Sequence, residues 1–246
     1  MTTGEEHRKH TQAGSFGAAA DAYERGRPPY PPEAVTWLVP EHATTVVDLG
    51  AGTGKLTRAL LAPGRTVIGV EPSAGMREQF SQVLPDVPVL EGTGESIPLP
   101  DSSVDALVCA QAWHWVDPEV AVPEVARVLR PGGRLGLVWN LRDASVPWVA
   151  ELDRILRDYA AAPTEDRQVE HVGAPFGLVE RQDFHWSHPM TAGDVMDMIA
   201  SRSYVITLDS ATREELLQRV RELLDTERPT AMPYTTECYR AELGQH

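Results

Sequence analysis

Alternating glycines and one acidic residue are the features of this sequence that are best suited to bind a ligand. Gly50, Gly52 and Gly54 follow one apolar run, and Glu71 ends the next apolar run along the chain. Glycines let a loop turn sharply and approach a ligand without Cβ clashes. A carboxylate at a strand end can accept hydrogen bonds from two ribose hydroxyls. The segment 45–71 therefore predicts a strand, a loop, a helix and a second strand that together hold a nucleoside.

Two familiar nucleotide-binding loops do not match this spacing. A phosphate-cradling P-loop would need glycine in place of Leu49 and a hydroxyl residue in place of Leu56. A dinucleotide-binding loop would need a small residue in place of Lys55, so that its helix could pack closely on the strand. The spacing disfavours both loops. On this segment alone, a dinucleotide site and a glycine-rich turn with no ligand are the alternatives.

The glycine loop and three later segments resemble one family of proteins. The run VVDLGAGTGKLT at 46–57 resembles motif I of the class I methyltransferases that use S-adenosylmethionine (SAM). The other blocks resemble the family's ribose-binding acid, its adenine-flanking loop and its entry to the fifth strand, at 70–76, 91–105 and 130–135. Four blocks in the right order are more specific than one glycine loop. The resemblance covers residues 16–140.

Three shorter segments resemble one branch of this family. A Phe-Gly-x-x-Ala-x-x-Tyr pattern at 16–23 and an Arg-Pro-x-Tyr-Pro pattern at 27–31 precede the glycine loop, and the pair His114-Trp115 follows the fourth predicted strand. These segments are similar to those of small-molecule methyltransferases of type 11, which include the trans-aconitate methyltransferase-like proteins. The resemblance implies a small-molecule acceptor.

Alternating strands and helices predict a doubly wound α/β sheet with its ligand at the carboxyl ends of the parallel strands. The family resemblance implies a Rossmann-like sheet of seven strands, mostly parallel with the last strand antiparallel, and a helical cap. We expect a flexible tail at 1–14 and a single domain at 15–246, with cap and acceptor elements at about 15–40 and 141–232. Expected strands lie near 45–49, 66–70, 87–90, 105–110, 134–139, 177–189 and 234–239, and expected helices near 18–23, 31–38, 118–129, 148–161, 191–201 and 212–228.

The resemblance also implies a role in cofactor binding for the residues that match its motifs. Glu71 would bind the ribose hydroxyls, and Asp48 would hold either the loop or the ammonium group of SAM. Arg27 would contact the cofactor carboxylate, because a guanidinium offers two donors in a plane. Thr93 stands where the family often has an aspartate that contacts the adenine amino group, which leaves that contact open. The expected SAM-binding residues are Arg27, Asp48, Gly50, Gly52, Glu71, Met76, Gly94 and Glu95.

A histidine and several aromatic residues are the candidates for work on the acceptor. His114 follows the fourth predicted strand and is the predicted base, since imidazole exchanges protons near neutral pH. A carboxylate acceptor would need no base, and His114 would then only orient it. The segment 16–30 is expected to close over the cofactor as a lid. Aromatic residues that either line an acceptor pocket or pack in the core are Tyr23, Tyr30, Trp113, Trp115 and Trp139.

Composition argues against several classes of partner. The 246 residues include 22 basic and 36 acidic side chains, a net charge of −14, which opposes binding to a phosphate backbone. No apolar run approaches the roughly 20 residues of a membrane span, and the two cysteines are typical of a reduced, cytoplasmic protein. His185 and His188 would lie on opposite faces of a strand, so no metal site is indicated.

The sequence therefore predicts an enzyme that transfers the methyl group of SAM to a small molecule, at oxygen rather than at nitrogen or carbon. The sulfonium already activates the methyl group, so the enzyme needs to position the acceptor, exclude water and remove a proton where required. The alternative is a protein of the same fold that binds SAM without catalysis or without moving its methyl group.

Overall fold

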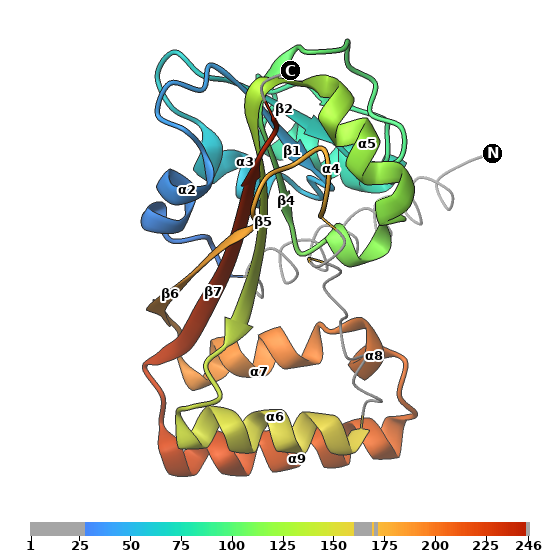
Figure 1. Ribbon diagram of the computed structural model, residues 1–246. Coiled ribbons are helices and arrows are strands. Elements are labelled where there is room, and N and C mark those ends of the chain that lie inside the picture. The colour runs from blue at the N-terminus through green and yellow to red at the C-terminus, as the bar shows by residue number, and fades with distance from the viewer. Residues whose placement is uncertain (1–27, 160–168, 170–171, 245–246) are drawn as a thin grey trace, which may run out of the picture. The chain divides into compact units, whose positions relative to one another are not determined.

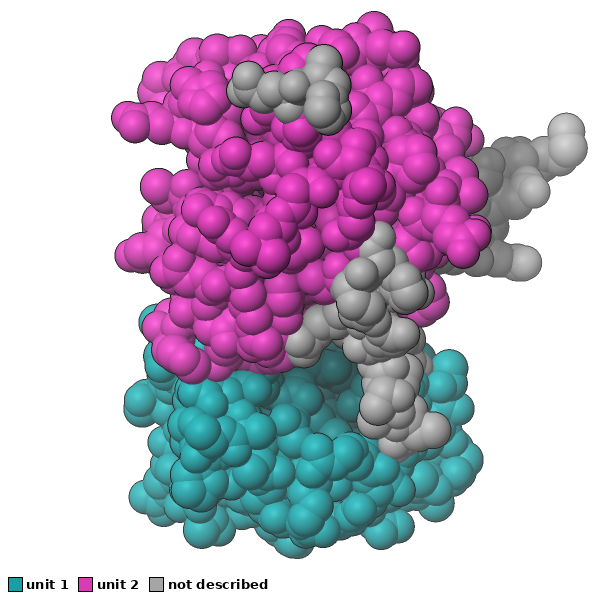
Figure 2. All heavy atoms as spheres, in the orientation of Figure 1, with its two compact units in different colours: residues 1–28, 142–163, 187–234 teal, residues 29–141, 164–186, 235–246 magenta. Residues whose placement is uncertain are grey.

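The computed structural model describes residues 28–159, 169 and 172–244 of the chain (Figure 1). The expected tail at 1–14, the helix at 18–23, and the site residues Tyr23 and Arg27 lie outside the described residues. The described part divides into two compact units (Figure 2). We call 29–141, 172–186 and 235–244 the sheet unit, and 142–159 and 187–234 the helical unit.

Seven strands form one sheet in the order β3-β2-β1-β4-β5-β7-β6. Parallel pairs join β1 to β2 and β4, β2 to β3, and β4 to β5, so the predicted doubly wound sheet is confirmed. The chain crosses from one half of this sheet to the other between β3 and β4, next to β1. Ligands of open α/β sheets bind at such a switch point. The strands are β1 Thr45–Leu49, β2 Thr66–Val70, β3 Val89–Leu90, β4 Val104–Ala110, β5 Leu129–Arg142, β6 Glu180–Pro189 and β7 Ala231–Glu242.

Strand β7 runs against β5. The backbone N–H of Gly132, near the start of β5, donates to the carbonyl of Leu243, just after β7, over 3.2 Å. The N–H of Asp143, just after β5, donates to the carbonyl of Pro233, near the start of β7, over 3.0 Å. The start of each strand thus pairs with the end of the other. This confirms the antiparallel last strand.

The two faces of the sheet carry separate hydrophobic clusters, because successive side chains of a strand point to opposite faces. Val46 of β1 packs with Leu38 in one cluster, and the next residue, Val47, packs with Val125 in the other. Helices α2 and α3 therefore cover the face opposite to α5 (Figure 1). The helices of the sheet unit are α2 Pro32–Leu38, α3 Lys55–Leu60, α4 Ala74–Val83, α5 Pro118–Val128 and the short 3-10 helix η1 Trp113–Trp115.

The helical unit contains the helices expected in the second half of the sequence. Helix α9 packs against both α6 and α7, and their apolar faces bury residues such as Leu152, Val195 and Leu216. The helices are α6 Pro147–Tyr159, α7 Ala192–Ala200, α8 Ser203–Ile206 and α9 Ser210–Glu227. Helices α6, α7 and α9 confirm the expected ones, whereas α8 was not predicted. Within the described part of the chain, none of the helices has both the length and the apolar character of a membrane span.

Candidate active site

The glycine loop connects β1 to α3 in a conformation that needs its glycines. Gly50, Gly52 and Gly54 have left-handed φ angles of 71°, 55° and 88°, which other residues rarely adopt. A Cβ on Gly50 would lie 2.7 Å from the Cβ of Ala112, so the loop packs tightly against the turn after β4. A Cβ on Gly52 would meet no atom of the described residues within 4 Å. Gly52 is therefore the point at which the loop backbone is open to a ligand.

Glu71 is buried beside this loop, directly after β2. Its side chain accepts hydrogen bonds from the backbone N–H of Gly52 at Oε2 (3.0 Å) and of Ser73 at Oε1 (2.9 Å). The residue is 8% exposed. Each carboxylate oxygen has capacity for a further donor. The structure thus brings Glu71 and the glycine loop together in the arrangement that a nucleoside site requires.

Asp48 in β1 is a buried carboxylic acid with one oxygen that has no partner. Its Oδ2 accepts a hydrogen bond from the Thr57 hydroxyl (2.5 Å), whereas Oδ1 has no hydrogen-bond partner among the described residues. Burial raises the pKa of Asp48 to about 7, against the lowering effect of Thr57, and the negative Glu71 raises it further. A buried acceptor without a partner suits an incoming donor such as an ammonium group. These residues therefore fit SAM.

Gly94 and Glu95 form the tip of a tight turn between β3 and β4. Thr93 and Ser96 close this turn by exchanging backbone hydrogen bonds of 3.1 and 3.3 Å. The Glu95 carboxylate accepts a bond from the backbone N–H of Asp117, at the start of α5, over 2.7 Å. Burial would raise the pKa of Glu95, but the N–H of Asp117 and the Thr93 hydroxyl outweigh it, so the pKa is lowered. Glu95 is therefore held ionised in this turn.

The turn after β4 has a strained backbone. Gln111 has a φ angle of 57°, an uncommon value for a residue with a side chain, and such residues gather at functional sites. Two hydrogen bonds to the next strand, β5, hold it in place: its N–H donates to the Val138 carbonyl (2.9 Å) and its Nε2 to the Asn140 carbonyl (3.1 Å). The turn is thereby held against the glycine loop, which Ala112 contacts.

His114 lies in η1, directly after this turn. Its Nδ1 is buried and has no hydrogen-bond partner within the described part of the chain. Its ring lies 4.8 Å, centroid to centroid, from the ring of Trp115, which is 81% exposed. The half-buried imidazole thus lies just after the carboxyl end of β4, where open α/β sheets bind their ligands.

The other predicted aromatic residues have different environments. Trp113 and Trp139 are fully buried in the hydrophobic cluster that includes α5, so their positions favour packing over acceptor contact. Tyr30 is half-buried and packs against the cluster that includes α2. Met76 is half-buried in α4. Contacts of these side chains with a ligand stay predictions.

Three residues near the site were missed from the sequence. Thr57 supports Asp48, and Gln111 shapes the turn after β4. Asn140 donates from Nδ2 to the Pro29 carbonyl (3.0 Å) and accepts from the Thr236 hydroxyl (2.6 Å). Only Gln111 carried a local signal, because it directly follows an apolar strand. The partners of Asn140 are far away in the sequence, and no local pattern connects them.

An open, mostly parallel sheet with a glycine loop after β1 and a buried acid after β2 defines the class of Rossmann-like nucleoside-binding proteins. Comparison with known proteins gives the family. The model of the methyltransferase domain family matches residues 47–137. An uncharacterized methyltransferase of Mycobacterium tuberculosis is 51% identical over 237 residues, which are 94% of this chain and 96% of that protein. The chain belongs to this methyltransferase family and is a SAM-dependent methyltransferase.

More distant proteins agree with this assignment. An uncharacterized methyltransferase-like protein of Schizosaccharomyces pombe is 33% identical over 213 residues, which cover 83% of each chain. A solved structure from Anaeromyxobacter dehalogenans, described as a type II methyltransferase, has a TM-score of 0.65 at 23% identity. The match covers 89% of this chain and 97% of that one. This second likeness concerns the fold alone.

Proposed function

We propose that this enzyme methylates an oxygen atom of a small molecule, as a member of the branch similar to the trans-aconitate methyltransferase-like proteins. The observation that carries the proposal is the position of His114. His114 directly follows the turn after β4, which packs against the glycine loop through Ala112, and its Nδ1 has no hydrogen-bond partner among the described residues. A candidate proton acceptor thus follows, two residues further along the chain, the residue that contacts the loop assigned to the cofactor.

The cofactor residues have separate roles in this proposal. Glu71 binds the ribose hydroxyls while it keeps the N–H of Gly52 in place. Asp48 attracts the ammonium group through its Oδ1, which has no hydrogen-bond partner among the described residues, and the open backbone at Gly52 gives the amino-acid part room. Gly94, Glu95 and Met76 border the adenine, and Arg27 binds the carboxylate. SAM, when bound, supplies the activated methyl group.

His114 acts on the acceptor in this proposal. Its imidazole would take the hydroxyl proton while the oxygen–methyl bond forms and the sulfur–methyl bond breaks, so that the products would be a neutral ether and neutral S-adenosylhomocysteine. The exposed ring of Trp115, together with Tyr30 and the predicted Tyr23, offers apolar surface to the acceptor. The net charge of −14 supports a small acceptor rather than a nucleic acid. Cys109 and Cys238 are buried free thiols, which supports a cytoplasmic location.

The acceptor class is tested by incubating cell extracts with the enzyme and SAM that carries a labelled methyl group. Mass spectrometry should find the label in a small molecule as a methyl ester or ether. Label in RNA, DNA or protein would contradict the small-molecule proposal, and label on nitrogen or carbon would contradict methylation at oxygen. Binding of SAM without any transfer would support the non-methylating alternative.

The role of His114 is tested once an acceptor is known. His114→Ala should lower kcat by about 10² to 10⁴ if the imidazole removes a proton, while affinity for S-adenosylhomocysteine stays unchanged. The loss should shrink as pH rises, because the acceptor then ionises unaided. His42→Ala, at an exposed histidine before β1, is the matched control and should be silent. A small, pH-independent loss confined to KM would make His114 a binding residue and indicate an acidic acceptor.

A further inference from the structure

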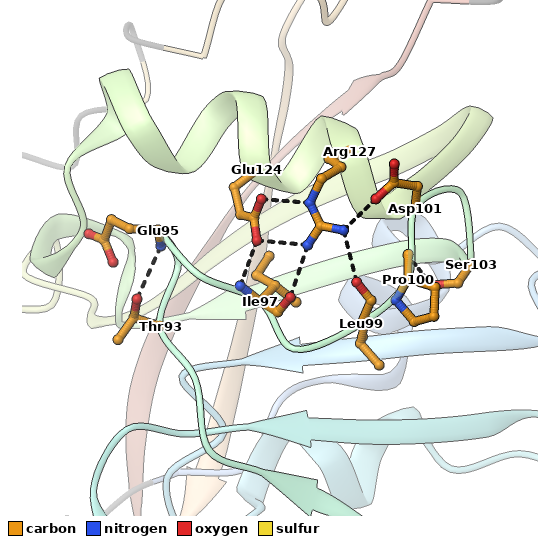
Figure 3. A network of polar contacts seen from close by, with 9 residues as sticks. All are labelled: Thr93, Glu95, Ile97, Leu99, Pro100, Asp101, Ser103, Glu124 and Arg127. Carbon is orange, nitrogen blue, oxygen red and sulfur yellow. Dashed lines mark hydrogen bonds and ion pairs between the residues drawn. The ribbon is translucent and has the colours of Figure 1, made fainter.

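The turn that carries Gly94 and Glu95 is the first part of a longer loop, 91–103, which has almost no regular structure of its own. Only the pairing of Thr93 with Ser96 interrupts it. A loop of this kind keeps its shape only if other elements hold it. In this structure one helix, α5, provides most of the polar contacts (Figure 3).

Arg127 of α5 donates to two backbone carbonyls of the loop. Its Nη2 bonds to the carbonyl of Ile97 over 3.0 Å, and its Nη1 to that of Leu99 over 2.9 Å. The same Nη1 pairs with the Asp101 carboxylate at 2.6 Å. One guanidinium therefore bonds to every second residue of the loop from Ile97 to Asp101, because its donors form a rigid fork.

Glu124, one helical turn before Arg127, also bonds to the loop. Its Oε1 accepts a bond from the backbone N–H of Ile97 over 2.7 Å, so both polar groups of the Ile97 backbone bind α5. Two further bonds, to the Nε and Nη2 of Arg127, align the guanidinium. The Glu124 side chain is only 17% exposed, and its bonds to Arg127 hold its pKa below the usual range against the opposing effect of burial.

The same helix also contacts the tip of the turn. The N–H of Asp117, which precedes α5, binds the Glu95 carboxylate. A Cβ on Gly94 would approach Val116 Cγ1 to 2.6 Å and Ala121 Cβ to 3.5 Å, so this glycine lies directly on the start of the helix. Helix α5 thus holds the tip of the turn at one end and its base, through Ile97, further along.

We propose that Glu124 and Arg127 are positioning residues of the SAM site, which fix Gly94 and Glu95 in place for the adenine without touching the cofactor themselves. This inference rests on the proposed role of that turn. Partners that orient the ligands of a metal change its affinity by about 10- to 100-fold when they are removed, and we expect an effect at the lower end of that range for residues that orient a binding loop.

The test measures dissociation constants for S-adenosylhomocysteine by calorimetry, well below the melting temperature. Arg127→Ala should raise the dissociation constant by about tenfold. Arg127→Lys should retain part of the wild-type affinity. The matched control is Arg134→Ala, which also removes an arginine that binds a backbone carbonyl, that of Trp37, and a carboxylate, that of Glu242, away from the loop. The control should lose stability but keep its affinity.

Two further measurements, of the affinity for a smaller ligand and of amide hydrogen exchange, distinguish a positioning role from a general loss of structure. 5′-Methylthioadenosine contains adenine and ribose but no amino-acid part, so Arg127→Ala should weaken it by the same factor as S-adenosylhomocysteine. The Ile97 amide should exchange faster in Glu124→Ala, which lacks its acceptor. Unchanged affinity in folded Arg127→Ala or Glu124→Ala overturns the proposal, as does an equal loss in Arg134→Ala. If Glu71→Ala weakens binding while these variants do not, the cofactor site stands and this inference fails.

Discussion

At the scale of single residues, Glu71 combines two tasks that the sequence could not separate. Its carboxylate accepts the backbone N–H groups of Gly52 and Ser73, which orders the loop, and it has lone pairs left for ribose hydroxyls. A merely solvated acid at a strand end would not be 8% exposed with both oxygens engaged. Its burial supports a place inside the site.

Replacing Glu71 tests this directly. Glu71→Ala should weaken S-adenosylhomocysteine binding by about 1.5 to 3 kcal/mol, because charge-assisted hydrogen bonds are lost. Titration calorimetry measures the change. Glu33→Ala is the matched control, since Glu33 is an exposed acid in the first turn of α2. Wild-type affinity in a folded Glu71→Ala variant would remove this residue from the site.

Asp48 should make stability depend on pH. Its pKa is raised by burial to about 7 in the folded chain, from an ordinary value of 3.8. The folded state therefore holds this proton more tightly than the unfolded state between these values, and stability falls as pH rises through them. Asp48→Asn, which cannot ionise, should escape this loss. Its stability relative to wild type should increase between pH 5 and 8, by roughly 2 to 3 kcal/mol.

Denaturant unfolding at several pH values measures this difference. The same variant should bind S-adenosylhomocysteine less well, because a neutral amide attracts an ammonium group less than a carboxylate does. A pH-independent difference in stability would mean that Asp48 does not titrate in this range.

At the scale of elements, the three glycines of the loop serve different purposes: two allow close packing within the protein, and one leaves the backbone open to a ligand. Gly50 and Gly54 face the protein closely, whereas Gly52 faces open space. Gly64 provides a comparison, because it has a similar φ angle of 76°, also faces open space, and lies in the turn before β2. The two glycines thus carry the same backbone strain in different surroundings.

Gly52→Ala and Gly64→Ala should therefore lose similar stability, about 1 kcal/mol each, from the left-handed backbone. Only Gly52→Ala should also lose S-adenosylhomocysteine affinity, by more than about tenfold, since its methyl group would occupy space meant for the ligand. Thermal unfolding and calorimetry on both variants provide the measurements. Equal affinities would show that the cofactor does not approach the loop at Gly52.

At the scale of the whole molecule, ligand binding should stabilise the folded chain by mass action. At a concentration 100-fold above its dissociation constant, S-adenosylhomocysteine should add about 2.7 kcal/mol and raise the melting temperature by several degrees. NAD should have no effect, because the loop lacks the small residue that a dinucleotide fingerprint needs at Lys55. Differential scanning fluorimetry compares the two ligands, and a similar shift with NAD would contradict the site.

The sequence by itself determined the parallel half of the sheet and the glycine loop between its first strand and helix. Strands β1 and β2 lie where the apolar runs predicted them, at Thr45–Leu49 and Thr66–Val70. These features are local: a strand at the centre of a parallel sheet is mostly apolar, and a left-handed backbone in a tight loop favours glycine at fixed positions. The antiparallel last strand was expected only from the family resemblance.

Tertiary structure decided which side chains meet. Strand β5 extends over Leu129–Arg142, well beyond the expected 134–139, because its pairing partner β7 is itself long. Trp113 and Trp139 lie in the core, although aromatic side chains at these positions also suited an acceptor pocket. Asn140 reaches Pro29, and Arg127 reaches Ile97 and Leu99, across separations of 111, 30 and 28 residues. Such contacts depend on how helices and strands are placed in space, which no pattern of neighbouring residues encodes.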